Sequence, residues 1–342
     1  METVFVTGTT GFIGSKLVEI LLERGFCVRG LCRPRTFSNP PGREAVLEKL
    51  VNHPNFQCVD GDITDPESLR QGMLGCDFVF HLAAYAKNWS PDPAIYTHLN
   101  VDAMRSVFQI AKELQVRKIV WTSTIVTFGP TKRGEIRDES SSPRLRDTYF
   151  TVYEKTKTIA EQEALHWAKK GLPLVIVNPT RVYGPSLFSE GNAVVQLILD
   201  YVKGKAPFLP NRGINVGNYA FVDDVALGHL LALEKGRVGE RYILGGENAS
   251  LREFLKLVDE VSGKRHCKLP LLKIGPLLFS WFQEKRAKWF GIHPRITPGW
   301  VRTFLVDWAY SCEKAKQELG YAPISLREGL QKTWNWLLLN EK

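Results

Sequence analysis

The chain has 342 residues, of which 44% are hydrophobic and 24% are charged, the composition of an ordinary folded protein with a buried core. The net charge of +9 is spread along the chain without zinc-finger spacing, an RNA-binding signature or a basic region with heptads, so we expect no nucleic-acid partner. The six cysteines show no CxxC pair and no histidine at metal-binding spacing, which predicts reduced thiols and no metal site. No apolar run reaches the about 18 residues that cross a membrane, and the first residues lack a signal-peptide layout, so we expect a cytoplasmic protein.

Short apolar runs alternate with amphipathic stretches through the first half of the chain. The runs predict strands at Thr3–Thr7, Val28–Cys32, Phe56–Val59, Phe78–Leu82, Lys118–Ser123 and Leu174–Val177. Helical spacing predicts helices near Ile13–Leu22, Glu44–Leu50, Pro66–Met73, Asn100–Leu114 and Val152–Lys170. Buried strands that alternate with helices indicate an α/β fold, a doubly wound parallel-sheet Rossmann domain with helices on both faces.

The second half is less regular than the first. Helical spacing predicts helices near Asn192–Lys203, Asp224–Leu233, Leu251–Val261 and Leu326–Leu339. We therefore place a dinucleotide-binding domain at residues 1–182, with residues 217–247 packing back onto it. A smaller, mostly helical substrate-binding domain follows at residues 183–342 and would lie over the carboxyl ends of the strands, where open α/β sheets bind ligands.

A glycine-rich turn follows the first predicted strand and opens the first predicted helix. It reads Gly8-Thr9-Thr10-Gly11-Phe12-Ile13-Gly14. One glycine lets the chain turn sharply, another lets the backbone approach a pyrophosphate, and the last lets the helix pack close to the sheet. The anion then lies on free N–H groups at the positive end of the helix. The strand–turn–helix context favours dinucleotide binding over a purely structural turn.

The end of the second strand bears on the choice of dinucleotide. An acidic residue there would bind the ribose 2′-hydroxyl of NAD, whereas an arginine favours the 2′-phosphate of NADP. The strand ends Leu31-Cys32-Arg33-Pro34-Arg35, without a carboxylate. We therefore expect NADP(H) rather than NAD(H), with Arg33 as the main contact and Arg35 as a second candidate. A solvated surface arginine is the alternative.

A tyrosine and a lysine four residues apart on a helix share one face, and together they can serve as a proton donor with a nearby cation. Such pairs occur at Tyr153/Lys157, Tyr201/Lys205 and Tyr310/Lys314. The first pair begins a helix between two strands of the first domain. We therefore predict that Tyr153 and Lys157 are catalytic and that the other two pairs are ordinary surface pairs.

Further segments make the chain resemble the extended short-chain dehydrogenase/reductase family, and they occur in the family's order over about residues 3–250. They are the Gly-x-x-Gly-x-x-Gly turn, Asp60–Ile63, His81–Ala84, Val120–Gly129, Asn178–Pro185 and Phe221–Ala226. Within the family, Gly239–Asn248 and Leu251–Glu253 are most similar to dihydroflavonol 4-reductase-like proteins and to a bacterial type described as a hopanoid-associated sugar epimerase.

The resemblance implies residue roles. Tyr153 would be the acid/base, Lys157 would bind the nicotinamide ribose and lower the pKa of Tyr153, and Thr124 would hydrogen-bond the substrate oxygen. The implied cofactor contacts are Gly8, Thr10, Gly11, Phe12, Ile13, Gly14, Arg33, Asp62, Ile63, Leu82, Ala83, Ala84, Thr122, Tyr153, Lys157, Pro179 and Val182. We interpret Asp223 and Asp224 as structural and His81 as a core histidine.

Two departures from the nucleotide-sugar epimerases of this family favour a reductase. Those epimerases usually carry an acidic residue at the second strand end, where this chain has Arg33 nearby. They also carry an arginine for the sugar nucleotide's diphosphate at the position of Gly217. A nucleotide-sugar epimerase or dehydratase with bound NAD(P) stays the first alternative. A non-catalytic NADP-binding regulator is the second, although such relatives typically lose the Tyr/Lys pair.

An aromatic, apolar stretch in the second half bears on the substrate. It includes Leu277–Phe282, Trp289-Phe290, Trp300 and Phe304-Leu305. Such residues line pockets for apolar ligands, and they serve equally well as core and lid packing. Contact of the basic, aromatic segment Phe279–Phe290 with a membrane surface is a less favoured alternative.

The combined prediction is an NADP(H)-dependent oxidoreductase that interconverts a ketone or aldehyde and an alcohol on a hydrophobic small molecule. It would be dihydroflavonol reductase-like or 3-beta-hydroxysteroid dehydrogenase-like. The helices near residues 100–114 and 152–170 resemble the family's dimer-forming pair, so a homodimer and packing within one chain are both open.

Overall fold

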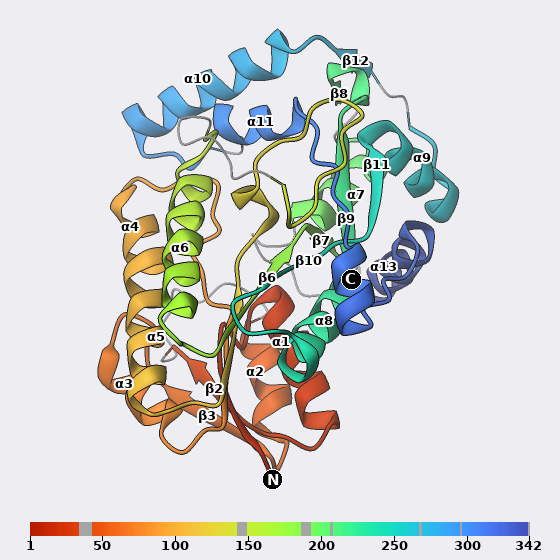
Figure 1. Cartoon of the computed structure of the whole chain (residues 1–342). Coiled ribbons are helices and arrows are strands. Elements are labelled where there is room, and N and C mark those ends of the chain that lie inside the picture. Colours follow the sequence, from red (N-terminus) through yellow and green to blue (C-terminus); the bar gives the residue numbers. More distant parts are fainter. Residues whose placement is uncertain are drawn as a thin grey trace.

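The larger of two lobes is built on a seven-stranded parallel sheet (Figure 1). The computed structural model describes residues 1–33, 43–141, 149–185, 193–205, 208–266, 269–294 and 296–340, so Arg35 and Cys267 lie outside the described residues. The sheet order is β10-β6-β5-β4-β1-β2-β3. The strands are β1 (Thr3–Thr7), β2 (Cys27–Cys32), β3 (Phe56–Asp60), β4 (Phe78–His81), β5 (Lys118–Thr122), β6 (Leu174–Pro179) and β10 (Arg241–Leu244). The predicted doubly wound α/β fold is confirmed.

Helices cover both faces of this sheet, because successive residues of each buried strand point to opposite sides. Val4 and Val6 of β1 pack in one apolar cluster and Phe5 packs in the other. The first cluster takes its helical residues mainly from α1 (Phe12–Glu23), α2 (Arg43–Val51), α8 (Val222–Lys235) and α12 (Glu313–Leu319). The second takes them from α3 (Pro66–Met73), α5 (Ala103–Glu113) and α6 (Val152–Lys169).

The strand register aligns the sites at which loops leave the sheet. Thr7 of β1 pairs with His81 of β4, and His81 pairs with Trp121 of β5. Because these strands are parallel, the loops that follow the three residues leave the sheet at the same edge. The sheet order also diverges on the two sides of β1 and β4, which makes this edge the switch point where such sheets bind ligands.

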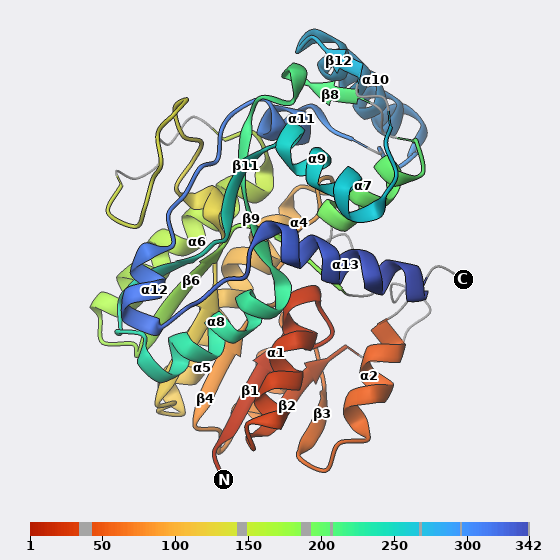
Figure 2. The same cartoon turned by 90° about the vertical axis from the view of Figure 1, so that its right-hand side faces the viewer.

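The smaller lobe covers this edge. It holds a three-stranded sheet, β11-β9-β7, and a two-stranded sheet, β12-β8. Its strands are β7 (Arg181–Tyr183), β8 (Phe208–Pro210), β9 (Val216–Phe221), β11 (Glu247–Ser250) and β12 (Leu269–Leu271). Its helices are α7 (Ala193–Val202), α9 (Leu251–Ser262), α10 (Ile274–Phe290), α11 (Pro298–Phe304) and α13 (Leu326–Asn340). The chain crosses between the lobes more than once, because β10 joins the large sheet beside β6 and α12 packs on α8 and β10 (Figure 2).

The long helix predicted from Asn100 to Leu114 is interrupted in the structure. It begins as α4 (Ala94–Thr97), passes through a π-helical turn at His98–Asp102 and continues as α5. Asn100 lies buried in this turn, where its side chain accepts a hydrogen bond from Tyr85 N at 2.7 Å and donates one to Thr156 Oγ1 at 3.2 Å. Through Asn100, the π-helical turn is therefore hydrogen-bonded both to the segment after β4 and to α6. The homodimer through α5 and α6 stays a prediction.

Gly14 offers a test of how tightly the turn after β1 is packed. A Cβ on Gly14 would collide with Gly8 O, whereas a Cβ on Gly275 in α10 would meet open space. Because forced overpacking against rigid backbone is costly, we expect Gly14→Ala to lower the free energy of unfolding by at least about 2 kcal/mol. The matched control Gly275→Ala should leave it unchanged or raise it by up to about 1 kcal/mol. Denaturant unfolding measures both, and equal midpoints for the two variants would contradict the packing described for the turn.

Candidate active site

The turn between β1 and α1 is shaped to receive an anion. Gly8 has a φ of 76°, and a Cβ there would lie 2.8 Å from Ala83 N, so only glycine lets the turn approach the end of β4 so closely. Gly11 is the N-cap of α1 without a side-chain hydrogen bond, and the first turn of α1 carries no acidic residue. The positive end of α1 is therefore left to a ligand, and the turn fits the pyrophosphate of a dinucleotide. Thr10 and Ile13 are partly exposed beside it, whereas the Phe12 side chain is buried.

The other predicted cofactor residues lie where strands of the large sheet end. Arg33 is exposed directly after β2, and Asp62 and Ile63 follow β3 partly buried. Leu82, Ala83 and Ala84 follow β4, while Pro179 ends β6 and Val182 lies in β7. The positions that end or follow strands of the large sheet share one edge of it because the strands are parallel. Val182 lies instead in the three-stranded sheet of the smaller lobe, in the strand that follows β6 after Thr180.

His81 is a core histidine, as expected. Its side chain is buried, and its Nδ1 lies 2.7 Å from Thr7 Oγ1. Burial lowers the pKa of His81 to about 3, with a smaller contribution from Lys157, so the ring is neutral. Thr7 Oγ1 also accepts a hydrogen bond from Ala83 N at 3.2 Å, which ties the end of β1 to the segment after β4.

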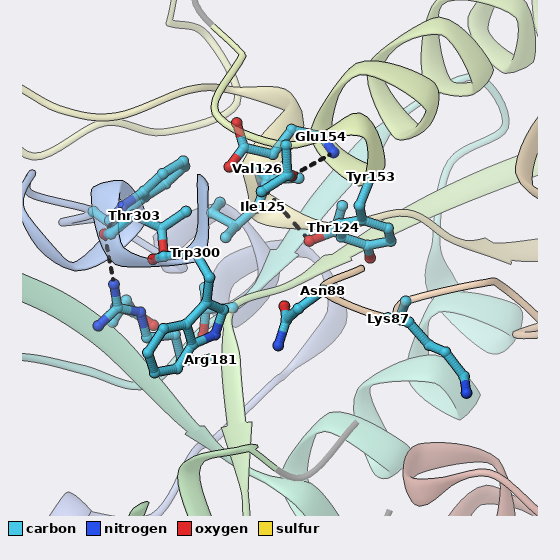
Figure 3. A pocket seen from close by; sticks show the side chains of 15 residues that line it. Lys87, Asn88, Thr124, Ile125, Val126, Tyr153, Glu154, Arg181, Trp300 and Thr303 are labelled. Atoms are coloured by element: carbon cyan, nitrogen blue, oxygen red, sulfur yellow. Dashed lines mark hydrogen bonds between the residues drawn. The ribbon is translucent and has the colours of Figure 1, made fainter. Parts of the chain in front are cut away.

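Tyr153 and Thr124 lie side by side on a cavity between the lobes (Figure 3). Tyr153 is in the first turn of α6, which Thr151 caps by accepting a hydrogen bond from Glu154 N at 3.1 Å. Thr124 follows β5 and its side chain lies beside that of Tyr153 (Figure 3). Burial raises the pKa of Tyr153 to about 12, and the neighbouring Thr124 side chain opposes this rise. Tyr153 therefore keeps its proton at neutral pH and is available as a donor.

Lys157 lies one helical turn beyond Tyr153 and is buried. Its Nζ donates a hydrogen bond to Thr122 O at 2.9 Å and lies 4.4 Å from the centre of the Trp121 ring. Burial lowers the pKa of Lys157 to about 7, against the opposing charge of Glu161. In the structure burial raises the pKa of Tyr153 and Thr124 opposes the rise. The role that the resemblance implied for Lys157, lowering the pKa of Tyr153, stays a prediction.

A buried polar network supports this pair, and the sequence analysis missed it. Glu161 Oε2 accepts hydrogen bonds from Asn178 Nδ2 at 2.6 Å and from Thr127 Oγ1 at 3.0 Å, and Glu161 Oε1 lies 3.1 Å from Arg241 Nη1. Asn178 Nδ2 also donates to Thr124 O at 3.1 Å. The network joins α6, β6 and β10 beneath Thr124. The signal in the sequence was that Glu161 follows Lys157 by one further helical turn, on the face of Tyr153.

Thr122 was predicted to contact the cofactor. Its carbonyl oxygen accepts the hydrogen bond from Lys157, and its Oγ1 lies 2.9 Å from His229 Nε2. His229 is fully buried, and burial lowers its pKa to about 4. Thr122 therefore positions Lys157 through its backbone, while its side chain bonds to a neutral histidine.

The cavity has a volume of about 190 Å³ and is lined from both lobes. Tyr153, Thr124 and Ile125 line it from the larger lobe, and Trp300 and Trp308 from the segment around α11. Of the aromatic residues that the sequence offered as pocket lining or core packing, Trp300 is the one that lines this cavity. The large side chains Phe279, Trp281, Phe282, Trp289 and Phe290 of α10 are exposed instead, because α10 packs through Ser280, Gln283 and Ala287.

Arg181 is a further lining residue that the sequence analysis did not single out. Its Nη2 donates to Thr303 O at 3.2 Å, and its guanidinium lies 4.6 Å from the centre of the Phe304 ring. A Cβ on Gly217 would come within 2.6 Å of Arg181 Nη1, so Arg181 fills the space that a side chain at position 217 would need. Its one sequence signal was its place in the segment Asn178–Pro185.

Similarities to known proteins agree with this geometry. Residues 4–245 match the model of the NAD dependent epimerase/dehydratase family. The chain is 34% identical to a putative dihydroflavonol 4-reductase of Synechocystis sp., over 98% of this chain and 94% of that one. It is 30% identical to sterol demethylase protein B of Methylococcus capsulatus, over 98% of each chain. A UDP-glucuronic acid 4-epimerase from Bacillus cereus, solved in complex with NAD, has a similar fold with a TM-score of 0.78 and 25% identity, covering 99% of this chain and 100% of that one.

The low pKa of Lys157 predicts a pH-dependent stability. The lysine pKa is 10.5 in the unfolded chain and about 7 in the folded one, so between these values the unfolded state binds more protons. The free energy of unfolding should therefore rise with pH from about 7 to about 10, by up to about 1.4 kcal/mol per pH unit from this group. Lys157→Met should lose this rise, and the exposed control Lys155→Met should keep it. Denaturant titrations at stepped pH measure the slopes, and equal slopes for wild type and Lys157→Met would contradict the burial of a titrating lysine.

Proposed function

Because the chain belongs to the NAD-dependent epimerase/dehydratase family and is a nicotinamide-dependent oxidoreductase, we propose that it uses NADP(H) to interconvert a carbonyl and an alcohol on a hydrophobic small molecule. The observation that carries this proposal is the cavity itself. Tyr153 and Thr124 line it as neighbours, and Lys157 lies one helical turn behind Tyr153 (Figure 3). Proton transfer to an oxygen needs a donor and a group that holds the oxygen in place, and both are present.

Different residues of this chain have different roles in the proposed reduction. The reduced nicotinamide supplies the hydride to the carbonyl carbon. Thr124 Oγ1 holds the carbonyl oxygen, and the Tyr153 hydroxyl donates its proton to that oxygen as negative charge develops on it. Burial keeps the Tyr153 proton in place until the substrate oxygen becomes the stronger base. Lys157, held against Thr122 O and Trp121, would bind the nicotinamide ribose.

The preference for NADP(H) rests on the residue after β2. Arg33 is exposed there, at the edge where the cofactor residues gather. A charge-assisted hydrogen bond from Arg33 to the 2′-phosphate would contribute about 1.5–3 kcal/mol, which is roughly a ten- to hundredfold preference in affinity.

The apolar part of the cavity supports a hydrophobic substrate. Ile125, Trp300 and Trp308 line it, and the names of two relatives refer to a dihydroflavonol and a sterol, both built on largely hydrophobic ring systems. The alternative is a nucleotide-sugar epimerase such as the UDP-glucuronic acid enzyme of similar fold. Position 217 argues against it, because this chain has Gly217 where such epimerases carry an arginine, and the Arg181 guanidinium lies beside it.

Replacing the proposed acid tests the reaction. We expect Tyr153→Phe to bind NADPH with near wild-type affinity and to lower turnover by about 10²–10⁴-fold, because only the proton donor is removed. Turnover is followed as oxidation of NADPH with a panel of aromatic ketones, sterol-type ketones and nucleotide sugars. Tyr201→Phe changes another Tyr/Lys pair and should leave turnover unchanged, because Tyr201 does not line the cavity. The prediction that Tyr201 is on the surface was wrong, since it is buried in the smaller lobe and its hydroxyl donates to Asp259 Oδ1 at 2.5 Å. Epimerised sugar without net oxidation of NADPH would favour the epimerase, and NADPH binding without turnover of any compound would favour a regulator.

Replacing Arg33 tests the choice of dinucleotide. We expect Arg33→Ala to weaken NADPH binding by roughly ten- to a hundredfold while NADH binding stays nearly constant, because only NADPH carries the 2′-phosphate. Equilibrium titration with each dinucleotide measures both affinities. The matched control Arg24→Ala removes an exposed arginine at the far end of α1 and should leave the ratio unchanged. A wild-type affinity ratio in Arg33→Ala would remove Arg33 from the site.

A further inference from the structure

The helix α10 turns a row of large apolar side chains to the outside of the molecule. Leu278 is 64% exposed, Trp281 54%, Phe282 57% and Trp289 72%. With Ile274 they recur at helical spacing and lie on one face, which we call the α10 outer face. A single exposed apolar residue is common on proteins, but a row of this kind marks a contact surface.

The opposite face of α10 packs on the protein, so the fold itself leaves the α10 outer face exposed. Ser280, Gln283 and Ala287 are buried, and Ser280 Oγ donates a hydrogen bond to Leu277 O at 2.9 Å. The helix therefore packs on the protein through small and polar residues and leaves its aromatic residues outside. An ordinary surface helix has the reverse arrangement.

Neighbouring segments extend the apolar surface. Leu269 and Leu272, in and after β12, are exposed just before α10 begins, and Phe290 and Ile292 are exposed where it ends. Figures 1 and 2 both show α10 along the end of the molecule opposite the N-terminus. A flat partner could therefore approach the outer face without meeting the larger lobe.

The charges on and beside α10 are mostly basic. Lys273, Lys285, Arg286 and Lys288 accompany a single acid, Glu284, which pairs with Lys288 at 3.1 Å. Lys285 Nζ lies 5.5 Å from the centre of the Trp281 ring, within the outer face. Aromatic and aliphatic side chains that are flanked by lysine and arginine are typical of helices that lie in the interface of an anionic membrane.

We propose that the α10 outer face binds flat to the surface of a membrane that contains anionic lipid. Trp281, Phe282 and Trp289 enter the boundary between headgroups and acyl chains, and the basic residues contact lipid phosphates. A second copy of the chain fits less well, because pairing two outer faces would bring Lys285 and its basic neighbours of both copies together. None of the described helices is long and apolar enough to cross a membrane.

The α10 outer face lies near the candidate active site. The helix packs against α11, from which Trp300 and Thr303 line the cavity. The bound lipid would thus lie one helix away from Tyr153. A hydrophobic substrate dissolved in the membrane would have a short path to the cavity, a consequence that rests on the proposed function, whereas the membrane contact itself does not.

Vesicle binding by the whole protein tests the proposal without any substrate. We expect wild type to sediment with vesicles of phosphatidylcholine and phosphatidylglycerol at low salt, and much less with phosphatidylcholine alone or at high salt. The variant Leu278→Gln/Trp281→Gln/Trp289→Gln should lower the partition coefficient by about tenfold or more, because three large apolar side chains of the outer face become polar. The control Leu338→Gln/Leu339→Gln changes exposed leucines of α13, which are 56% and 79% exposed, and should bind as wild type does.

Circular dichroism and NADPH titration show whether each variant is folded. If the triple variant unfolds, Lys285→Glu/Lys288→Glu replaces it, and this variant should lose binding to anionic vesicles while keeping the apolar residues. Wild type that stays in the supernatant with anionic vesicles at low salt would overturn the proposal. Undiminished sedimentation of the outer-face variants would also overturn it. A third result would overturn it as well: wild type is a dimer that does not bind vesicles, and the triple variant is a monomer.

Discussion

The hydrogen-bonded register that aligns Thr7, His81 and Trp121 across β1, β4 and β5 fixes the position of the candidate active site. The segments that follow these residues are the glycine turn, Leu82–Ala84 and the end of β5 that leads to Thr124. In the proposed function each has a different role, and the register brings all three to one edge of the sheet. The Thr7 side chain reinforces the alignment, since it contacts both His81 and Ala83 N.

The candidate active site also contains a buried lysine, Lys157. Burial of Lys157 is unfavourable for its charged form, and a Thr122 carbonyl, the Trp121 ring and the carboxylate of Glu161 offset only part of this cost. Glu161 is itself held by Asn178, Thr127 and Arg241. Such a network is difficult to explain as packing alone, because a hydrophobic core of the same volume would serve stability equally well.

Much of this was predictable from the sequence, for identifiable reasons. Six of the seven strands of the large sheet are short apolar runs that were predicted, whereas β10 was not, and the glycine turn has a spacing that few other structures require. Tyr153 and Lys157 were selected among three such pairs because theirs begins a helix between two strands, and their catalytic role stays a prediction. Arg181 was missed because its partner Thr303 lies far along the chain, and no local pattern reports such a contact. The aromatic residues of α10 were placed in a pocket or core, with a membrane surface as the less favoured alternative, since composition alone does not show that Ser280 and Gln283, rather than Trp281 and Trp289, face the protein.

The connections between the lobes restrict how the cavity can open. Only Thr180 separates β6 from β7, and α8 begins at the residue after β9 ends, so the base of the smaller lobe continues directly from the large sheet. A hinge rotation of that whole lobe would have to bend the chain at both of these short junctions together. The helix α11 lies outside them, so a displacement of this short helix, from which Trp300 and Thr303 line the cavity, would change the shape of the cavity without bending either junction.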